Sequence, residues 1–417
     1  MTCLGQTVLA RIVRVVEAGG DWYPVLPYQL GVVVPGWHEG IMQSPSIHGK
    51  PAPDVLVIGA GIFGLSVAWS CRKAGLSVRV LEAHHPGAGA SGGIVGALTP
   101  HAPGRWRPMM AFQFRALLSL PDRIAEIEAA TGRDCGYART GRLTPLPTEK
   151  TRAGAERDLA AAPETWGTAA SYEILDSLPP EAQGRLSSRM AAHGVVCDTV
   201  SARVWPRGYV EALKAALADC IDNDTPVRTL DPAAAKVEGQ DGSHHAGHIV
   251  LAAGPSLWAL AAPHLPGMAK GSAVKGQAAV LSADLSALPV VYTDGLYVIP
   301  HGPRRVSVGS TSEKRFDEPF RTDRLLDALL VRARRVVPAL AGAAVIERWA
   351  GLRPKSPGRE PVVGALPGHP RTWLAGGGFK ISFGIAHAAG DAVAAGIAGT
   401  EAPIPLPSSF DPAALAG

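Results

Sequence analysis

Residues 54–64 constrain this chain most, because an apolar run is followed at once by three closely spaced glycines. The run at 55–58 holds no polar residue, which predicts a strand buried on both faces of a sheet. Gly59 permits a tight turn, Gly61 lets the backbone approach a pyrophosphate, and Gly64 lets the next helix pack closely. This spacing predicts the first half of a dinucleotide-binding βαβ unit.

The second half of the unit follows at the expected distance. Residues 78–81 predict the second strand, and Glu82 directly after it is placed to accept the ribose hydroxyls of an adenosine. The helix between the strands points its free N–H groups and positive dipole end at the phosphates. A carboxylate at this position repels a 2′-phosphate, so NADP is disfavoured and FAD and NAD remain.

The charge and cysteine patterns limit the other classes of function. The net charge is +4, from 40 basic and 36 acidic residues spread along the chain, which is too mild and dispersed for a nucleic-acid binder. The longest apolar stretches have strand length or contain glycine and charge, so we expect no transmembrane segment. The five cysteines are scattered without a CxxC pair, as in a cytoplasmic protein with reduced thiols.

Residues 1–50 precede the first predicted core strand and have an uncertain role. They show no secretory signal pattern. Because Met42 begins a short polar lead-in, we expect residues 1–41 to be upstream sequence without a core role. Packing of Trp22, Tyr23 and Tyr28 against the main domain would contradict that expectation.

The rest of the chain predicts two interleaved domains. We expect a helix or helix pair at 108–131 interrupted at Pro121, a short helix that Ser91 begins as its N-cap, and a loose Pro-rich tail. Consecutive strand-like runs from about residue 266 predict an antiparallel sheet. The expected fold class is α/β (α+β overall), a Rossmann-type nucleotide domain with an inserted antiparallel-sheet substrate domain. The nucleotide domain comprises 51–105, 190–265 and 346–400, the substrate domain 106–189 and 266–345, and the tail 401–417.

Five motifs in order give the chain a resemblance to a known family. They are VIGAGIFG at 57–64, GASG at 89–92, VLAAG at 250–254, GLRP at 351–354 and GFKISFG at 378–384. The arrangement resembles the FAD-dependent D-amino-acid oxidase family, in particular its glycine oxidase and sarcosine oxidase members, over roughly residues 52–400. FAD is a long cofactor that needs a second Gly-rich cradle, which the loop after Glu82 supplies and which NAD would not use.

The resemblance implies a noncovalent FAD, because relatives with covalent flavin have a cysteine where this chain has Gly351. The adenosine end would lie at the first glycine motif, Val227 near the adenine, the second loop along the pyrophosphate, and 377–384 over the isoalloxazine ring. The implied cofactor-binding residues are Gly59, Ala60, Gly61, Ile62, Phe63, Gly64, Glu82, Ala83, Ala90, Ser91, Gly96, Ala97, Val227, Gly254, Gly377, Gly378, Phe379, Ile381 and Gly384.

The same resemblance implies oxidation of a C–N bond by hydride transfer to the flavin, giving an imine that hydrolyses. The substrate would be a small amino acid or N-methyl amino acid whose carboxylate needs a cationic anchor, for which a forked guanidinium is suited. Arg353 occupies the carboxylate-binding position, and Lys380 is similar to the substrate-binding lysine of sarcosine oxidase. Tyr297 is expected on the pocket wall, where its hydroxyl could bond the carboxylate or amine.

Other expectations and alternatives stay open at this point. His101, Arg105 and Arg107 would border the entrance, and the histidines at 244, 245 and 248 belong to a hairpin and strand start, so no metal site is expected. Tyr297 replaces the lysine that activates oxygen in sarcosine oxidase, which leaves the electron acceptor as oxygen or a quinone or other carrier. A homo-oligomer is possible. The alternatives are a flavin subunit of a larger dehydrogenase complex, a tRNA wobble-uridine modification module and an NAD-dependent dehydrogenase.

Overall fold

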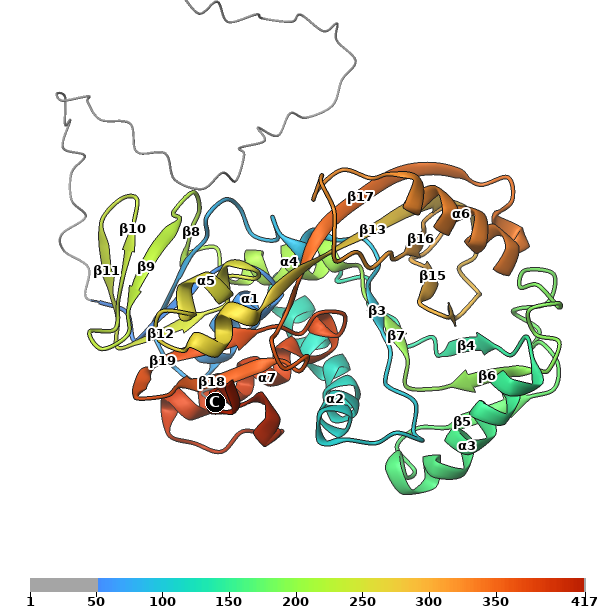
Figure 1. Cartoon of the computed structure of the whole chain (residues 1–417), viewed down its shortest axis with the longest axis horizontal. Coiled ribbons are helices and arrows are strands. Elements are labelled where there is room, and N and C mark those ends of the chain that lie inside the picture. The colour runs from blue at the N-terminus through green and yellow to red at the C-terminus, as the bar shows by residue number, and fades with distance from the viewer. Residues whose placement is uncertain (1–51, 416–417) are drawn as a thin grey trace, which may run out of the picture. The chain divides into compact units, whose positions relative to one another are not determined.

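The computed structural model describes residues 52–415 of the 417-residue chain (Figure 1). The expectations about residues 1–50, including Trp22, Tyr23 and Tyr28, lie outside the described residues. The described residues belong to one compact unit, which begins after Lys50.

A six-stranded sheet forms the centre of the first part of the fold (Figure 1). The strands of the predicted βαβ unit are adjacent inner strands of this sheet. Its order is β18-β19-β12-β1-β2-β8, with parallel pairing throughout except between β18 and β19. All the parallel strands therefore end at one edge of the sheet. The strands are β1 (Val55–Ile58), β2 (Val78–Leu81), β8 (Ile221–Asp222), β12 (His248–Leu251), β18 (Val362–Leu366) and β19 (His369–Gly376).

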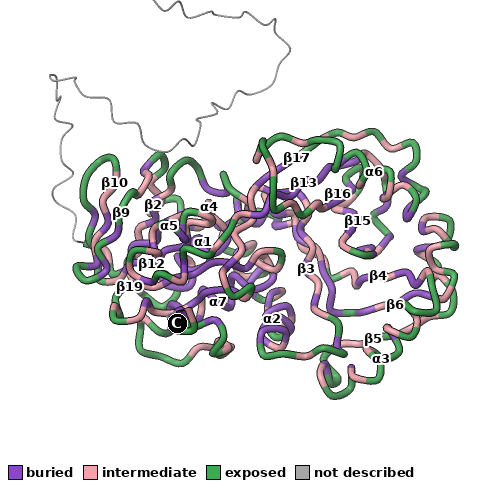
Figure 2. Tube along the Cα trace, in the orientation of Figure 1, coloured by how far each residue is buried: buried purple, intermediate pink, exposed green. Residues whose placement is uncertain are grey.

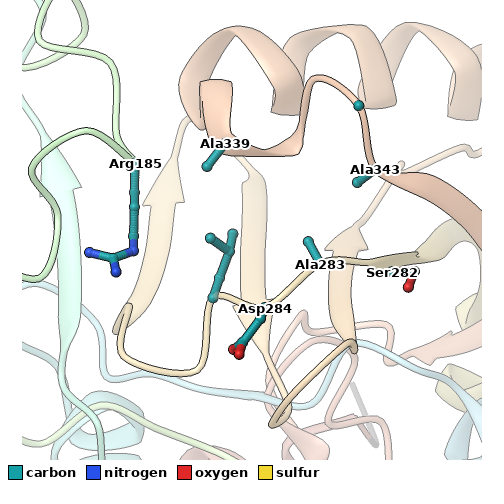
Figure 3. A pocket seen from close by; sticks show the side chains of 8 residues that line it. Arg185, Ser282, Ala283, Asp284, Ala339 and Ala343 are labelled. Atoms are coloured by element: carbon teal, nitrogen blue, oxygen red, sulfur yellow. The ribbon is translucent and has the colours of Figure 1, made fainter.

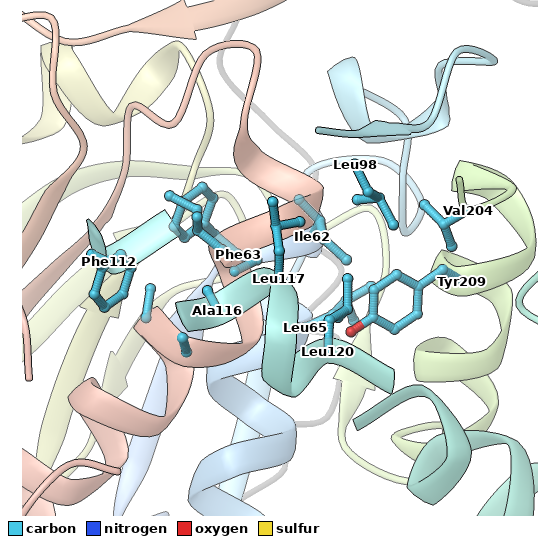
Figure 4. Packing of buried hydrophobic residues seen from close by; sticks show 14 of the residues in the cluster. Ile62, Phe63, Leu65, Leu98, Phe112, Ala116, Leu117, Leu120, Val204 and Tyr209 are labelled. Carbon is cyan, nitrogen blue, oxygen red and sulfur yellow. The ribbon is translucent and has the colours of Figure 1, made fainter. Parts of the chain in front are cut away.

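Both faces of this sheet are covered, which explains the unbroken apolar run of β1. Val55 and Val57 pack against helices on one face, whereas Leu56 and Ile58 pack on the other. The first face carries α1 (Ile62–Lys73), α2 (Pro108–Thr131), α4 (Pro206–Ala216) and α7 (Ser382–Ala398), whose packing Figure 4 shows. The second face carries α5 (Ser256–Ala261) and a small sheet of β9 (Val227–Asp231), β10 (Lys236–Gly239) and β11 (Ser243–His245).

Helix α2 is continuous, so the predicted interruption at Pro121 is wrong. Proline removes one backbone donor and leaves the carbonyl four residues earlier without its helical partner. Here the Leu117 carbonyl accepts a hydrogen bond from Arg139 Nη2 at 3.0 Å, and Leu117 and Leu120 are buried in the core (Figure 4). Although α2 is 24 residues long, no helix among the described residues has the length and apolar character to cross a membrane.

An eight-stranded sheet forms the centre of the second part of the fold, in the order β17-β13-β16-β15-β14-β4-β6-β5. It is antiparallel except for the β14–β4 pair, which is parallel. One face packs on α6 (Arg324–Val336), and α3 (Glu149–Thr165) contacts its β5 end. The strands are β4 (Arg142–Pro145), β5 (Tyr172–Leu175), β6 (Val195–Asp198), β13 (Ser272–Ser282), β14 (Val290–Thr293), β15 (Leu296–Pro300), β16 (Val306–Gly309) and β17 (Ala344–Lys355).

Three elements pack with a different sheet from the one that the predicted domain boundaries gave them. Strands β6 and β17 belong to the eight-stranded sheet, although their residues fall in segments assigned to the nucleotide domain. Helix α2 packs with α1, α4 and α7, although its residues fall in the segment assigned to the substrate domain. Strand pairing and helix docking join segments far apart in sequence, which a local pattern does not reveal.

The C-terminal segment is not loose up to residue 415, so that expectation is also wrong. Phe410 is fully buried and meets Phe112 of α2 edge to face, with ring centroids 5.2 Å apart. Pro412 is buried as well, and Ser409 Oγ donates to Glu360 Oε2. The single aromatic residue in this Pro-rich stretch thus anchors the segment to the core. Figure 2 colours the buried parts of the chain purple.

Candidate functional site

The turn between β1 and α1 has the geometry that its glycines predict. Gly59 adopts a φ of 101°, a left-handed conformation that favours glycine. A side chain at Gly64 would overlap the Gly59 carbonyl oxygen, so only glycine lets α1 begin this close to the strand. A Cβ at Gly61 would meet only the Ser91 hydroxyl, at 3.3 Å, which leaves this position accessible to a ligand.

Ser91 does not cap a helix of its own, so the N-cap prediction is wrong. It lies within the short 3-10 turn Ala90–Gly92, and its Oγ accepts a hydrogen bond from the Ile62 N–H of α1 at 2.9 Å. The second glycine loop is thereby joined to the start of the first helix. The other N–H groups in the first turn of a helix have no partner within the helix and are where a phosphate binds.

Glu82 is held at the end of β2 by backbone donors. Its Oε2 accepts from the Ala60 N–H at 2.7 Å and its Oε1 from the His84 N–H at 3.0 Å. The Glu82 carbonyl accepts from the Thr225 N–H at 2.8 Å, which brings the segment before Val227 beside it. The two residues predicted for the adenosine end therefore lie near one another.

The other predicted cofactor residues gather at the carboxyl edge of the parallel sheet. Ligands bind at this edge in open α/β sheets. Ala83 follows β2, Gly254 follows β12, Gly377, Gly378 and Phe379 follow β19, Ile381 and Gly384 begin α7, Ala90 lies in the second loop, and Gly96 and Ala97 enter β3 (Ala97–Leu98). A Cβ at Gly378 would lie 2.9 Å from the Phe63 ring, which shows how closely the first and last motifs pack.

The second glycine loop lies against one face of the eight-stranded sheet. Val95 fills the space over Gly309, where a side chain would overlap it, and the Trp349 ring lies 3.4 Å from the Cβ position of Gly93. Thr99 Oγ1 is 2.9 Å from the Tyr297 hydroxyl oxygen. Residues 93–99 therefore connect the nucleotide-binding loops to the eight-stranded sheet.

Arg353 and Tyr297 lie on this same face of the sheet. Directly paired residues of antiparallel strands point to the same side, as do residues two apart in one strand. The register pairs Arg353 with Val274 and Gly351 with Gly276. Further along the sheet, Ala278 of β13 pairs with Gly309 of β16, and Gly309 pairs with Tyr297 of β15. Arg353 and Tyr297 therefore lie on the same face of the sheet.

The guanidinium of Arg353 lies over Gly276 and is held by three acceptors. Nη1 donates to Ser310 Oγ at 2.8 Å, and Nη2 donates to the carbonyls of Lys275, at 3.3 Å, and Thr311. A Cβ at Gly276 would lie 2.5 Å from Cζ and overlap Nη2. Buried Arg353 Nε has no hydrogen-bond acceptor among the described residues.

Lys380 approaches the same place from the last motif. Arg353 Cζ is 5.5 Å from the centroid of the Phe379 ring, and Lys380 Nζ is 5.7 Å from it. Burial lowers the pKa of Arg353 to about 10, so the guanidinium stays charged at neutral pH. Partial loss of solvent, together with the charge of Arg353, lowers the pKa of Lys380. The two predicted cations are thus brought together.

Tyr297 and His101 are both largely removed from water. Burial raises the pKa of Tyr297 above its usual range, so its hydroxyl stays protonated at neutral pH. His101 Nδ1 is 2.5 Å from Gln113 Oε1, and burial lowers its pKa, which favours the neutral ring. Gln113 Nε2 in turn donates to the Thr99 carbonyl at 2.9 Å, so His101 is linked to the loop that carries the Tyr297 partner.

Arg105 and Arg107 lie on the exposed stretch before α2. Arg107 Nη1 is 3.6 Å from Glu360 Oε1, in the loop that follows the GLRP motif. This places the stretch near the residues after Arg353. Whether it borders a substrate entrance stays a prediction.

Sequence reasoning missed three residues that surround the Arg353 guanidinium, namely Gly276, Ser310 and Thr311. All three belong to other strands or loops and reach the arginine only through the sheet register. One local signal existed, because Gly276 lies inside a strand, where a glycine marks a close approach of another group.

A separate hollow of about 430 Å³ lies at the opposite end of β13 from Arg353 (Figure 3). Its walls come from the end of β13 and the segment after α6, with the Arg185 side chain at its rim. It shares no residue with the predicted site, and we assign it no role.

Comparison with known proteins identifies the family. The profile of the FAD dependent oxidoreductase (DAO) family matches residues 54–395, which span the glycine turn, the second loop, Arg353 and Lys380. The chain belongs to the FAD dependent oxidoreductase family. FAD is therefore its cofactor, and the NAD-dependent alternative is excluded.

The chain is similar in sequence to several proteins named glycine oxidase. That of Bacillus licheniformis is 27% identical over 347 residues, covering 82% of this chain and 92% of that protein. That of Pseudomonas putida is 38% identical over 108 residues, covering 26% of this chain and 30% of that protein. The similarity to the first of these proteins spans most of both chains.

Solved structures agree with the fold. Glycine oxidase from Geobacillus kaustophilus superposes with a TM-score of 0.77 at 22% identity, covering 87% of this chain and 98% of that one. Iminodiacetate oxidase from Chelativorans sp. BNC1 gives 0.72 at 24% identity, covering 86% and 98%. The expected combination of a Rossmann-type domain and a second sheet domain is confirmed.

The residues present fit FAD. Gly61 leaves open the space that a Cβ would occupy at the N-terminus of α1, and Ser91 ties the second glycine loop to the same helix. Glu82 lies at the end of the adjacent strand. The segment around Gly61 and Ser91 would hold the pyrophosphate, and Glu82 would hold the ribose.

Proposed function

We propose that this protein oxidises the C–N bond of a small amino acid or N-methyl amino acid. The observation that carries the proposal is the half-buried guanidinium of Arg353, whose Nε is buried. It lies on the face of the eight-stranded sheet against which the second glycine loop packs. Its Nε–H has no acceptor among the described residues, and Lys380 lies near the same Phe379 ring. A half-buried cation with a free donor suits a carboxylate, which accepts charge-assisted hydrogen bonds.

In the proposed mechanism the chain binds and orients the substrate. The Arg353 guanidinium takes the carboxylate, and the ammonium of Lys380 adds a second positive charge. The Tyr297 hydroxyl, hydrogen-bonded to Thr99, donates to the carboxylate or accepts from the amine. Burial raises the pKa of Tyr297, so its hydroxyl stays protonated, and no strong protein base is required if the substrate amine binds in its neutral form. When bound, FAD supplies the acceptor for a hydride from the carbon that bears the nitrogen, and the resulting imine hydrolyses.

An anaerobic absorbance titration tests this proposal. The purified holoenzyme is titrated with glycine, sarcosine, proline and a panel of D-amino acids while the flavin band is followed. We expect one of these compounds to bleach the band, which also identifies the substrate. A band that none of them bleaches would contradict the proposal and favour a partner-dependent flavin subunit. Oxygen uptake with the bleaching substrate then distinguishes an oxidase from a dehydrogenase that uses another acceptor.

Lys380 should give carboxylate binding a dependence on alkaline pH. Lysine is charged below its pKa, and burial together with the charge of Arg353 lowers the pKa of Lys380, so its attraction for a carboxylate is lost as pH rises through that lowered value. We expect the dissociation constant of acetate, followed by the flavin spectrum, to rise over this range. Lys380→Met should bind acetate more weakly at neutral pH and keep only the alkaline change that comes from Arg353, whose pKa is about 10. An unaltered pH profile in Lys380→Met would place Lys380 outside the site.

Gly276→Ala tests the fit of the arginine over its strand. The added methyl group would overlap the guanidinium, which must move away from its acceptors. We expect the Michaelis constant for the carboxylate substrate to rise on the order of tenfold, about the value of one charged hydrogen bond. Gly342→Ala is the matched control, because a Cβ there meets nothing within 4 Å. Equal Michaelis constants in the two variants would show that the position of the guanidinium does not matter.

A further inference from the structure

A cluster of buried polar side chains lies on the face of β13 opposite Arg353. Lys275 and Gln277 flank Gly276, so their side chains point to the α6 side of the sheet, where they are 2% and 0% exposed. Gln277 Nε2 donates to Glu313 Oε1 at 2.9 Å and to Asp323 Oδ1 at 2.8 Å. Lys275 Nζ lies 3.1 Å from Asp323 Oδ2 and 3.7 Å from Glu313 Oε2.

Capping of α6 does not account for this cluster. Asp323 is the N-cap of α6 and accepts from the Leu325 N–H at 2.9 Å, for which a neutral serine or asparagine would serve as well. Taking a lysine and a glutamate out of water costs free energy that their attraction and hydrogen bonds must offset, so the burial of this ion pair is weak evidence for a role in stability. The hydrogen bond from Gln277, the largest cause, lowers the pKa of Asp323 to about 2, so the carboxylate is ionised at neutral pH.

Thr311 connects the cluster to Arg353. Its hydroxyl accepts from the Gln277 N–H at 2.8 Å and donates to Glu313 Oε1. Its own N–H donates to the Gln277 carbonyl at 3.1 Å, and its carbonyl accepts from Arg353 Nη2. Ser310, the preceding residue, accepts from Arg353 Nη1. Thr311 thus fixes two of the three acceptors that orient the guanidinium.

Glu313 fixes the third acceptor. Its backbone N–H donates to the Lys275 carbonyl at 2.9 Å, and the Lys275 N–H donates back to its carbonyl at 3.0 Å. The same Lys275 carbonyl accepts from Arg353 Nη2. Segment 310–313 is therefore bonded to β13 on both sides of Gly276, the residue over which the guanidinium lies.

We propose that Thr311, supported by Glu313 and Gln277, is a positioning residue that holds the Arg353 guanidinium in the orientation that binds the substrate carboxylate. This inference rests on the proposed function of Arg353. It assigns the buried cluster a task in substrate affinity, exerted through Arg353 rather than by contact with substrate.

The test compares Thr311→Val, which keeps the shape but lacks the hydroxyl, with Thr311→Ser, which keeps the hydroxyl. Each holoenzyme is checked for its flavin-to-protein ratio and titrated with acetate, and binding is followed by the flavin spectrum. We expect acetate to bind about tenfold more weakly to Thr311→Val and within about twofold of wild type to Thr311→Ser. With substrate, the loss should appear in KM and leave kcat nearly unchanged.

Arg353→Ala and the double variant Arg353→Ala/Thr311→Val separate the two proposals. If Thr311 acts through Arg353, the valine substitution should weaken acetate binding no further once Arg353 is absent. An equal loss in both backgrounds would overturn the positioning role, as would wild-type binding by Thr311→Val when Arg353→Ala binds weakly. Wild-type binding by Arg353→Ala would instead overturn the proposed function of Arg353.

A second variant keeps the inference testable if Thr311→Val does not fold or retain FAD. Ser310→Ala removes the acceptor of Arg353 Nη1 at a half-buried position and leaves the cluster intact. We expect it to weaken acetate binding several-fold, again only when Arg353 is present. Unchanged binding by Ser310→Ala would show that the guanidinium does not depend on segment 310–313.

Discussion

Arg353→Ala is expected to raise the Michaelis constant for a carboxylate substrate by about 30- to 1000-fold while FAD remains bound. The guanidinium is charged and largely desolvated, so its hydrogen bonds to a carboxylate are worth about 2–4 kcal/mol, and each 1.4 kcal/mol is a factor of ten. The cofactor residues lie in other elements, so the flavin-to-protein ratio should not change. Steady-state kinetics with the substrate found by anaerobic titration measure the effect.

Arg353→Lys is the matched control, because lysine keeps the charge but not the planar fork. We expect its Michaelis constant to lie between those of wild type and Arg353→Ala. A substrate analogue without a carboxylate should react at similar rates with all three proteins. If Arg353→Ala left the Michaelis constant for the carboxylate substrate unchanged, Arg353 would not belong to the site.

The cofactor half of the fold could be predicted because its requirements are local. The left-handed φ at Gly59 and the overlap that a side chain at Gly64 would cause both arise between neighbouring elements of one βαβ unit. Their spacing is therefore visible in the sequence. The position of Glu82 at the end of the next strand follows from the same unit.

The details that were wrong depend on partners far away in the chain. Pro121 would end an isolated helix, but Arg139 satisfies the carbonyl that it frees. Serine is a common helix cap, yet Ser91 accepts a hydrogen bond from the first turn of α1, which begins 29 residues earlier, and caps no helix of its own. Phe410 lies in a segment of loop composition and is nevertheless part of the core. In each case a tertiary contact overrides a correct local rule.

The substrate half lies between these cases. Arg353, Lys380 and Tyr297 were found through motifs and a resemblance, and the structure brings the two cations together around Phe379. Their roles remain predictions. The surroundings of the arginine, Gly276 and segment 310–313, come from strand register, which no single stretch of sequence specifies.

Gly61→Val is expected to abolish FAD retention while leaving the protein folded. Gly61 has a φ of −78° and a ψ of −179°, which any residue adopts, so the substitution strains no backbone. A Cβ there meets only the Ser91 hydroxyl at 3.3 Å, so the branches of valine project into the space through which a pyrophosphate approaches the N–H groups of α1. The purified variant should be colourless and the wild type yellow.

Gly64→Val separates loss of the cofactor from loss of the fold. Its side chain would overlap the Gly59 carbonyl and force α1 away from the sheet, at a cost of at least about 3 kcal/mol. Thermal unfolding of the apoproteins should therefore show a large loss of stability for Gly64→Val and little for Gly61→Val. A yellow, FAD-loaded Gly61→Val protein would mean that the pyrophosphate does not pass over Gly61, since the protein itself leaves that space open.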